Sequence, residues 1–156
     1  MRTKLFLAGA MLAALSACAT TGGEDARGWR EIDALLYSVV LVDDGPAIRD
    51  GDIVTYDLAY VWQADDSQGR GWQLYDDVQS DCAKKLVLLG HRTLWGEDGA
   101  VQVDETKTEW EGIAAGGIAD IATKAKCEGV YPEDPLVIGP DQDLMSTARA
   151  WLREQE

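Results

Sequence analysis

The sequence predicts a single α+β domain, with an antiparallel β-sheet followed by two helices. Between residues 29 and 105, short apolar runs alternate with turns rich in Asp and Gly, which is typical of strands joined by tight connections. After Trp110, the apolar residues recur at helical spacing instead of every second position. Strands and helices that are segregated along a chain favour the α+β class.

Residues 1–17 have the composition of a secretory signal peptide. Arg2 and Lys4 precede an apolar run that ends at Leu15. This run is shorter than the about 20 residues that a membrane-spanning helix needs, and small residues follow it, as they do before a signal-peptide cleavage site. We therefore expect these residues to be removed from the mature protein.

The tetrapeptide at residues 15–18, Leu-Ser-Ala-Cys, resembles the lipobox of bacterial lipoproteins. In that motif the cysteine, here Cys18, is acylated and becomes the new N-terminus, and two or more acyl chains give stable membrane anchoring. The alternative is an ordinary signal peptide cleaved after an Ala-x-Ala-like site, for which Ala17-Cys18-Ala19 offers small residues. Because Ala19 and not Asp follows the cysteine, the lipoprotein pattern implies the outer membrane of a Gram-negative bacterium, with the domain facing either the periplasm or the outside.

The predicted mature chain has two parts. Residues 18–28 are small or polar, so we expect a lipidated, flexible tether. The domain then covers residues 29–156.

The formal net charge is −14, and residues 1–17 carry two cations and no acid, so their removal gives −16. Such acidity disfavours nucleic acid and favours basic proteins, cationic ligands or divalent metals as partners; the alternative is that the carboxylates only keep the domain soluble.

Apolar and β-branched runs indicate the strands. The clearest run begins at Ile53, because every second residue from Val54 to Trp62 is apolar and gives a wholly apolar face. Asp98-Gly99 between two apolar runs is a hairpin signal. We expect strands at 34–42, 53–62, 72–78, 85–95 and 101–105.

Two helices are expected after the strands. The first has Ile118, Ile121, Ala122 and Ala125 on one face and a C-terminal stop at Gly129. The second begins at about Asp141, and its apolar stripe comprises Leu144, Ala148, Trp151 and Leu152. The segment 131–135 between them contains two prolines and is expected to cross the surface irregularly.

Cysteine use agrees with an oxidising compartment. If Cys18 carries lipid, Cys82 and Cys127 remain as an even pair, and such pairs form disulfides in secreted proteins. Closing a loop of this length stabilises a fold by roughly 4 kcal/mol in the chain-entropy model. The alternative is two buried free thiols.

Recognisable catalytic and metal-binding motifs are missing from the sequence. The chain has one histidine, His91, and no Gly-x-Ser-x-Gly, Cys-x-x-Cys or His-Glu-x-x-His motif. Pairs of acids at Asp43-Asp44 and Asp65-Asp66, and Asp141 with Asp143, offer oxygen ligands for calcium, but Asp is also a common turn former. We predict no catalytic residue, no metal and no cofactor, and no small-molecule substrate is evident.

The order and spacing of Trp and Cys landmarks resemble the surface-adhesin protein E family, small lipidated outer-membrane proteins of proteobacteria. The similarity covers residues 29 to about 128. It rests on Trp29, a strand through Val42, Gly51-Asp52-Ile53-Val54, Cys82, Lys84-Lys85, Gly99, Trp110, Gly116-Gly117 and Cys127. The resemblance implies an antiparallel sheet packed by a C-terminal helix, a Cys82–Cys127 disulfide and an adhesin-like domain.

Three function classes follow from these observations. The first is a non-enzymatic, lipid-anchored outer-membrane protein that binds a protein partner, and some of its six tryptophans are candidate binding anchors. The second is an acidic inhibitor of a basic hydrolase such as lysozyme, suggested by the net charge. The third is a hydrolase that uses two carboxylates, for which the 28 acids of the chain single out no pair.

Overall fold

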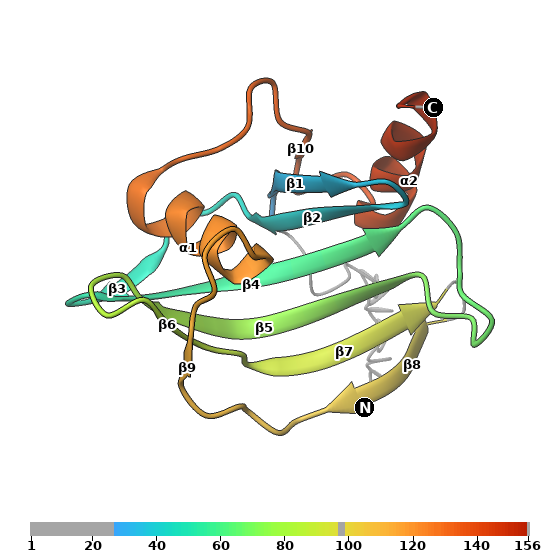
Figure 1. Ribbon diagram of the computed structural model, residues 1–156. Helices are drawn as coiled ribbons and strands as arrows, with labels where there is room; N and C mark the ends of the chain where they lie inside the picture. The colour runs from blue at the N-terminus through green and yellow to red at the C-terminus, as the bar shows by residue number, and fades with distance from the viewer. Residues whose placement is uncertain (1–26, 97–98, 156) are drawn as a thin grey trace, which may run out of the picture.

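An antiparallel sheet forms the centre of the molecule in the computed structural model, which describes residues 27–96 and 99–155 (Figure 1). Every strand pair in it is antiparallel, as the sequence predicted. Its strands in the described part of the chain are β1 (Trp29–Leu35), β2 (Ser38–Asp43), β3 (Ile48–Asp50), β4 (Ile53–Trp62), β5 (Trp72–Asp81), β6 (Leu86–Leu88), β7 (His91–Gly96), β8 (Gly99–Asp104), β9 (Glu111–Gly112) and β10 (Val137–Ile138).

The two longest strands, β4 and β5, lie at the middle of the sheet. The strand order is β10-β1-β2-β4-β5-β6-β9, with β3 also on β4, β7 also on β5, and β8 on β7. The shorter strands β6 and β7 pair with successive parts of β5, at residues 79–81 and 72–76. The sheet is therefore built around one long central hairpin.

The two helices, α1 (Ile118–Glu128) and α2 (Leu144–Glu154), cover different faces of the sheet. Packing alternates along β2: Val40 and Val42 belong to the cluster under α1, whereas Val39 and Leu41 belong to the cluster under α2. Because successive side chains of a strand point to opposite faces, a strand covered on both sides is apolar throughout. This explains why all four residues are fully buried. The α+β class is confirmed.

The predicted single strand at 34–42 is wrong. The chain instead forms a hairpin, in which β1 ends at Leu35, β2 begins at Ser38, and Leu35 pairs with Ser38. Leu36 and Tyr37 make the turn. The turn contains no Gly, Pro, Asn or Asp, so its sequence cannot be distinguished from the apolar strands on either side.

The predicted strand at 85–95 is also wrong, because it divides into β6 and β7. The division coincides with a bulge in the β4–β5 pairing, where Asp77 has a φ of 58°. A Cβ atom at Gly90 would lie 1.6 Å from the Asp76 carbonyl oxygen. Only glycine allows this close approach, so the chain passes the bulge at Gly90 and pairs again from His91.

Both helices end or begin at the residues that capping chemistry favours. Gly129, at φ 72°, stops α1, and its N–H donates to the carbonyl oxygens of Ala125 and Lys124. The second helix begins at Leu144 rather than at about Asp141, because the Asp143 carboxylate accepts from the Ser146 N–H at 2.7 Å as the N-cap. The predicted Cys82–Cys127 disulfide is confirmed and joins the end of α1 to the turn after β5.

The last residues of the predicted tether contact the domain. Arg27 forms an ion pair with Asp57 and lies over the Trp29 ring. The Gly28 carbonyl oxygen accepts from the Asp44 N–H at 2.8 Å. Within the described residues, contacts with the domain thus extend two residues ahead of Trp29, which is fully buried. Cys18 and the predicted signal peptide lie outside the described residues, and neither described helix is long and apolar enough to cross a membrane.

Candidate functional site

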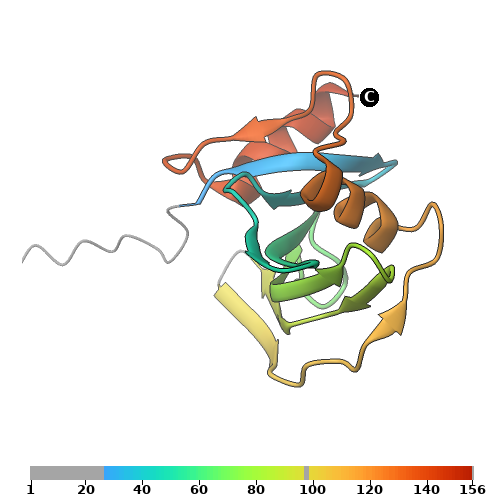
Figure 2. The same cartoon turned by 90° about the vertical axis from the view of Figure 1, so that its left-hand side faces the viewer.

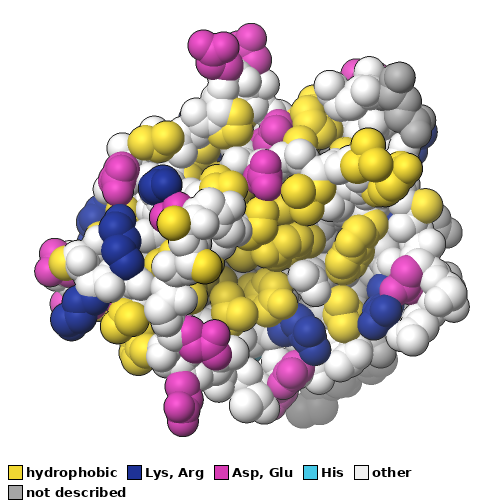
Figure 3. All heavy atoms as spheres, in the orientation of Figure 1, with side chains coloured by type: hydrophobic (Ala, Val, Ile, Leu, Met, Phe, Trp, Pro, Cys, Tyr) yellow, Lys and Arg dark blue, Asp and Glu magenta, His cyan; other side chains and the backbone are white. Residues whose placement is uncertain are grey.

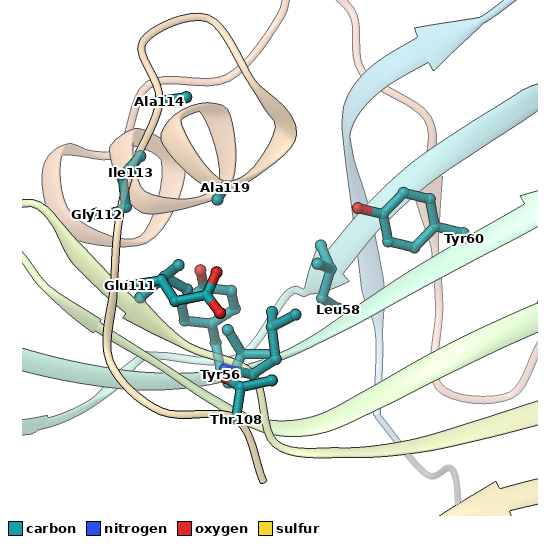
Figure 4. Close-up of a pocket in the computed structure, with 12 residues that line it drawn as sticks. Tyr56, Leu58, Tyr60, Thr108, Glu111, Gly112, Ile113, Ala114 and Ala119 are labelled. Atoms are coloured by element: carbon teal, nitrogen blue, oxygen red, sulfur yellow. Dashed lines mark hydrogen bonds between the residues drawn. The ribbon is translucent and has the colours of Figure 1, made fainter.

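An apolar pocket of about 230 Å³ lies on the α1 face of the sheet (Figure 4). Because successive side chains of β4 point to opposite faces of the sheet, Tyr56, Leu58 and Tyr60 line the pocket together. Other walls come from β5, β6, α1 and the chain segment that leads to α1. The lining residues are Tyr56, Leu58, Tyr60, Val78, Val87, Leu89, Thr108, Glu111, Gly112, Ile113, Ala114 and Ala119.

The segment 105–117, which we call the strap, closes one side of this pocket. Mostly backbone hydrogen bonds hold it against β6. The Thr108 N–H donates to the Leu89 carbonyl oxygen at 3.1 Å, and the Thr108 hydroxyl accepts from the Leu89 N–H at 2.9 Å. Further along, the Ile113 N–H donates to the Lys85 carbonyl oxygen at 3.0 Å. The Thr108 side chain therefore both anchors the strap and lines the pocket, whereas Glu111 and Ile113 line the pocket while backbone bonds hold their segment.

The polar side chains that line the pocket carry two phenols, one carboxylate and the Thr108 hydroxyl. The Tyr56 hydroxyl is buried and bonded to the Ser80 hydroxyl at 3.0 Å, and burial raises its pKa. Burial, with a contribution from Tyr75, raises the pKa of Tyr60 to about 12. Both phenols are thus neutral at pH 7. The exposed Glu111 side chain extends from the strap toward Tyr56 (Figure 4).

A second apolar surface lies at the β1–β2 turn. Leu36 is 82% exposed and Tyr37 is 63% exposed. A groove of about 500 Å³ separates the turn from α2 and is lined in part by Trp151. A second groove, of about 360 Å³, lies between Tyr37 and Trp62. We call Leu35, Leu36, Tyr37, Trp62 and Trp151 the hairpin-end surface.

Figure 3 shows both surfaces on one side of the molecule. Hydrophobic side chains gather over the middle of the sheet beside α1, and again near the β1–β2 turn. Lys, Arg, Asp and Glu surround these areas and are sparse within them. Contiguous apolar areas of this kind mark interaction sites more often than scattered apolar residues do.

Charges beside the hairpin-end surface are paired. Arg149 forms an ion pair with Asp65 and donates from Nε to the Trp62 carbonyl oxygen at 2.9 Å. Arg70 donates to Asp66 at 2.6 Å. Hydrogen bonds from the Arg70 side chain and backbone lower the pKa of Asp66 to about 2. The Asp65 and Asp66 carboxylates that follow Trp62 are thus each paired with an arginine.

Five of the six acids that the sequence offered as calcium ligands, all but Asp141, have structural partners among the described residues. Asp43 binds the Lys126 ammonium group at 3.1 Å, and Asp44 accepts from Arg30 at 2.7 Å. Asp143 caps α2. Within residues 27–96 and 99–155, no cluster of three or more His, Cys, Asp or Glu residues could hold a metal ion. His91 is half-buried at the start of β7.

Sequence reasoning missed both surfaces. Thr108 and Glu111 lie in a segment without apolar periodicity, so no local signal marks them as pocket residues. The sequence predicts Leu36 and Tyr37 inside a strand, whereas the structure places them in a turn. The unusual length of the run from Ala34 to Val42, nearly all of it apolar, is the one signal that favours a hairpin, because strands average five to six residues.

No protein-family model, curated protein or solved structure matches the chain. The resemblance to the surface-adhesin protein E family therefore stays a prediction.

Proposed function

We propose that the protein is a non-enzymatic outer-membrane lipoprotein that binds a protein partner through the hairpin-end surface. The observation that carries this proposal is the exposure of Leu36 and Tyr37 between two grooves. Aromatic and aliphatic anchors beside pockets are typical of the centres of protein interfaces. The proposed outer-membrane location rests on the sequence of residues 1–18. The binding role agrees with the resemblance to an adhesin family.

Charge favours a foreign partner over a second copy of this chain. Two copies would each bring a formal charge of −14, or −16 without residues 1–17, and would repel each other. A partner with net positive charge would be attracted to the acidic domain and would contribute apolar side chains to the grooves. We therefore propose a basic protein as the partner.

The direction of β1 also supports this role. The strand runs from Trp29 to Leu35, which places the hairpin-end surface roughly 20 Å from Trp29, at about 3.3 Å per residue. Figure 2 shows β1, in blue, crossing the molecule to the β1–β2 turn. A domain anchored through residues that precede Arg27 would direct the turn away from the membrane.

The test is affinity capture with the soluble form, residues 19–156, from envelope and extracellular extracts. We expect a basic protein to be retained, and the double variant Leu36→Ser, Tyr37→Ser to reduce its retention at least about tenfold, because truncated interface anchors cost 2 kcal/mol or more. Ile48→Ser is the matched control, since Ile48 is an equally exposed apolar residue on β3. The absence of a retained partner, or equal retention by both variants, would contradict the proposal.

The predicted anchor has its own test. We expect Cys18→Ala to move the protein from the membrane fraction to the soluble fraction without changing its fold, since the acyl chains would be lost. Cys82→Ser should leave the protein in the membrane fraction. Detergent-phase partition measures both variants. A Cys18→Ala variant that stays in the detergent phase would refute the anchor assignment.

The alternative, an acidic inhibitor of a basic hydrolase such as lysozyme, is supported by one feature of the fold. The loop between α1 and β10 projects from the domain (Figure 1) and carries the exposed acids Glu133 and Asp134. If this loop blocks a basic cleft, the domain should inhibit lysozyme, less so at high salt. Neutralising both acids as Glu133→Gln, Asp134→Asn should weaken inhibition more than Asp50→Asn. Absent or salt-independent inhibition would exclude this alternative.

A further inference from the structure

We propose that the strap pocket is a binding site for a small amphipathic cation, an alkylammonium molecule whose aliphatic tail enters the pocket and whose charged nitrogen lies beside Glu111. The site is separate from the hairpin-end surface. It takes a ligand of different chemistry, so the two proposals stand or fall independently.

The size and walls of the pocket fit an aliphatic tail. A dry cavity of about 150 Å³ lined by aliphatic and aromatic side chains is enough to bind benzene, and this pocket measures about 230 Å³. At roughly 30 Å³ per water-sized group, it holds about eight non-hydrogen atoms. Its walls are mainly aliphatic, formed by Leu58, Val78, Val87, Leu89, Ile113, Ala114 and Ala119.

The rim of the pocket selects a positive charge. Glu111 is exposed and makes no ion pair with any Lys or Arg of the described residues. The cations on adjoining segments already have carboxylate partners: Lys85 pairs with Glu128 at 3.4 Å and Lys107 with Asp77 at 3.6 Å. An anionic headgroup would therefore meet an unpaired carboxylate. A cationic headgroup would meet its counterion.

The neutral tyrosine hydroxyls also favour a cationic headgroup over an anionic one. Figure 4 shows the Tyr60 hydroxyl directed toward the space above Leu58. A neutral phenol accepts a hydrogen bond from an ammonium N–H without adding charge. Its edge-on contact with Tyr75, at a ring-centroid distance of 6.2 Å, holds the ring in place. An ammonium group at the rim would thus find a carboxylate and a phenol oxygen on opposite sides of the opening.

Calorimetric titration of residues 19–156 with octylammonium, octanol and octanoate tests the proposal. This form contains every residue of the described fold. We expect octylammonium to bind at one molecule per chain and at least about tenfold more tightly than octanoate, with octanol between them, because the ligands share a tail and differ in headgroup charge. The lack of saturable octylammonium binding, or equal binding of octanoate, would overturn the proposal.

Substitutions in the strap distinguish the contribution of the charge at the rim from that of the apolar pocket. Glu111→Gln should weaken octylammonium binding about threefold, as expected for a solvent-exposed ion pair, and leave octanol binding unchanged. Glu109→Gln is the matched control, because Glu109 is an exposed acid of the same strap that does not line the pocket. Equal effects of the two variants would indicate general attraction to an acidic protein and would refute the assigned site.

Ala119→Phe tests the pocket itself. The larger side chain should fill the space and abolish binding of both octylammonium and octanol. Far-ultraviolet circular dichroism must show that this variant is folded. If it is not folded, the comparison of Glu111→Gln with Glu109→Gln decides whether the strap pocket is the binding site. The hairpin-end variant Leu36→Ser, Tyr37→Ser should bind octylammonium normally. Retained binding by a folded Ala119→Phe variant would overturn the proposal.

Discussion

Lys126 is the most deeply buried cation of the described chain. Its side chain is 2% exposed. The ammonium group donates to the carbonyl oxygens of Asp43 and Gly45, at 2.7 and 3.0 Å, and to the Asp43 carboxylate at 3.1 Å. Three acceptors satisfy its three N–H groups, which makes burial of the charge tolerable. Lys126 thereby joins α1 to the turn after β2.

Replacing Lys126 by Met should destabilise the domain by about 3–5 kcal/mol, because the half-buried Asp43 carboxylate and two carbonyl oxygens lose the ammonium group. Urea unfolding followed by tryptophan fluorescence measures the change. Lys85→Met is the control, since Lys85 is 45% exposed and pairs with the exposed Glu128. Its cost should stay below about 1 kcal/mol. Similar costs for the two variants would show that burial does not determine the effect.

Asp120 gives a pH-dependent prediction. Hydrogen bonds from the Gly116 N–H at 2.9 Å and the Lys124 ammonium group at 2.8 Å lower the pKa of this carboxyl below its usual 3.8. A carboxyl whose pKa is depressed by folding stabilises the fold above the unfolded pKa, and this contribution is lost as pH falls through the folded pKa. The contribution is therefore complete at neutral pH.

Asp120→Asn should accordingly lower the melting temperature at pH 6–8 by a constant amount, and the difference from the unmodified chain should shrink below about pH 4. Asp50→Asn, at an exposed position on β3, is the control and should show little effect. Thermal melts across pH 2.5–8 provide the measurement. A difference that persists unchanged at pH 2.5 would contradict the assignment.

At the scale of elements, strands and helices with a regular apolar pattern are predictable from the sequence, whereas strands of two or three residues are not. The alternation of β4 and the helical stripes of α1 and α2 are local patterns, and Gly129 marks a helix end by its own backbone preference. The strands β3, β9 and β10 have only two or three residues each. That is too short for a period, so these strands form only because β4, β6 and β1 present partners.

The disulfide joins two elements, and its removal should destabilise the domain. Cys82→Ser, Cys127→Ser frees the end of α1 from the turn after β5. For a sequence separation of 45 residues, the chain-entropy model gives a loss of roughly 4 kcal/mol. Urea unfolding of the double variant measures it, and the double change avoids leaving one free thiol. A loss below about 1 kcal/mol would mean that packing alone positions α1.

At the scale of the whole molecule, both helix clusters share the same strands. β2 and β4 contribute alternate residues to the cluster under α1 and to the cluster under α2. Neither cluster can separate from the sheet without exposing apolar residues of strands that the other cluster needs. We therefore expect the domain to unfold as one cooperative unit.

Leu152→Ala tests this coupling. Leu152 is a buried residue of α2, so its truncation should cost about 2–5 kcal/mol. If the molecule is one unit, the most protected amides of α1 and of β4 should lose the same free energy of hydrogen exchange. Ser146→Ala, on the same helix, should have a small effect. Unchanged protection in α1 would show that α2 and its cluster open separately.

Sequence alone is sufficient to predict the fold class, the central strand β4, both helices, the Cys82–Cys127 pair and the acidity of the chain. These properties follow from local periodicity, capping residues and composition. The tertiary structure alone decided where the functional surfaces lie. The strap pocket combines residues from 56 to 119, and the hairpin-end surface brings Tyr37 beside Trp62 and Trp151. Contacts between residues so distant in the chain depend on strand pairing and helix packing, which local sequence patterns do not encode.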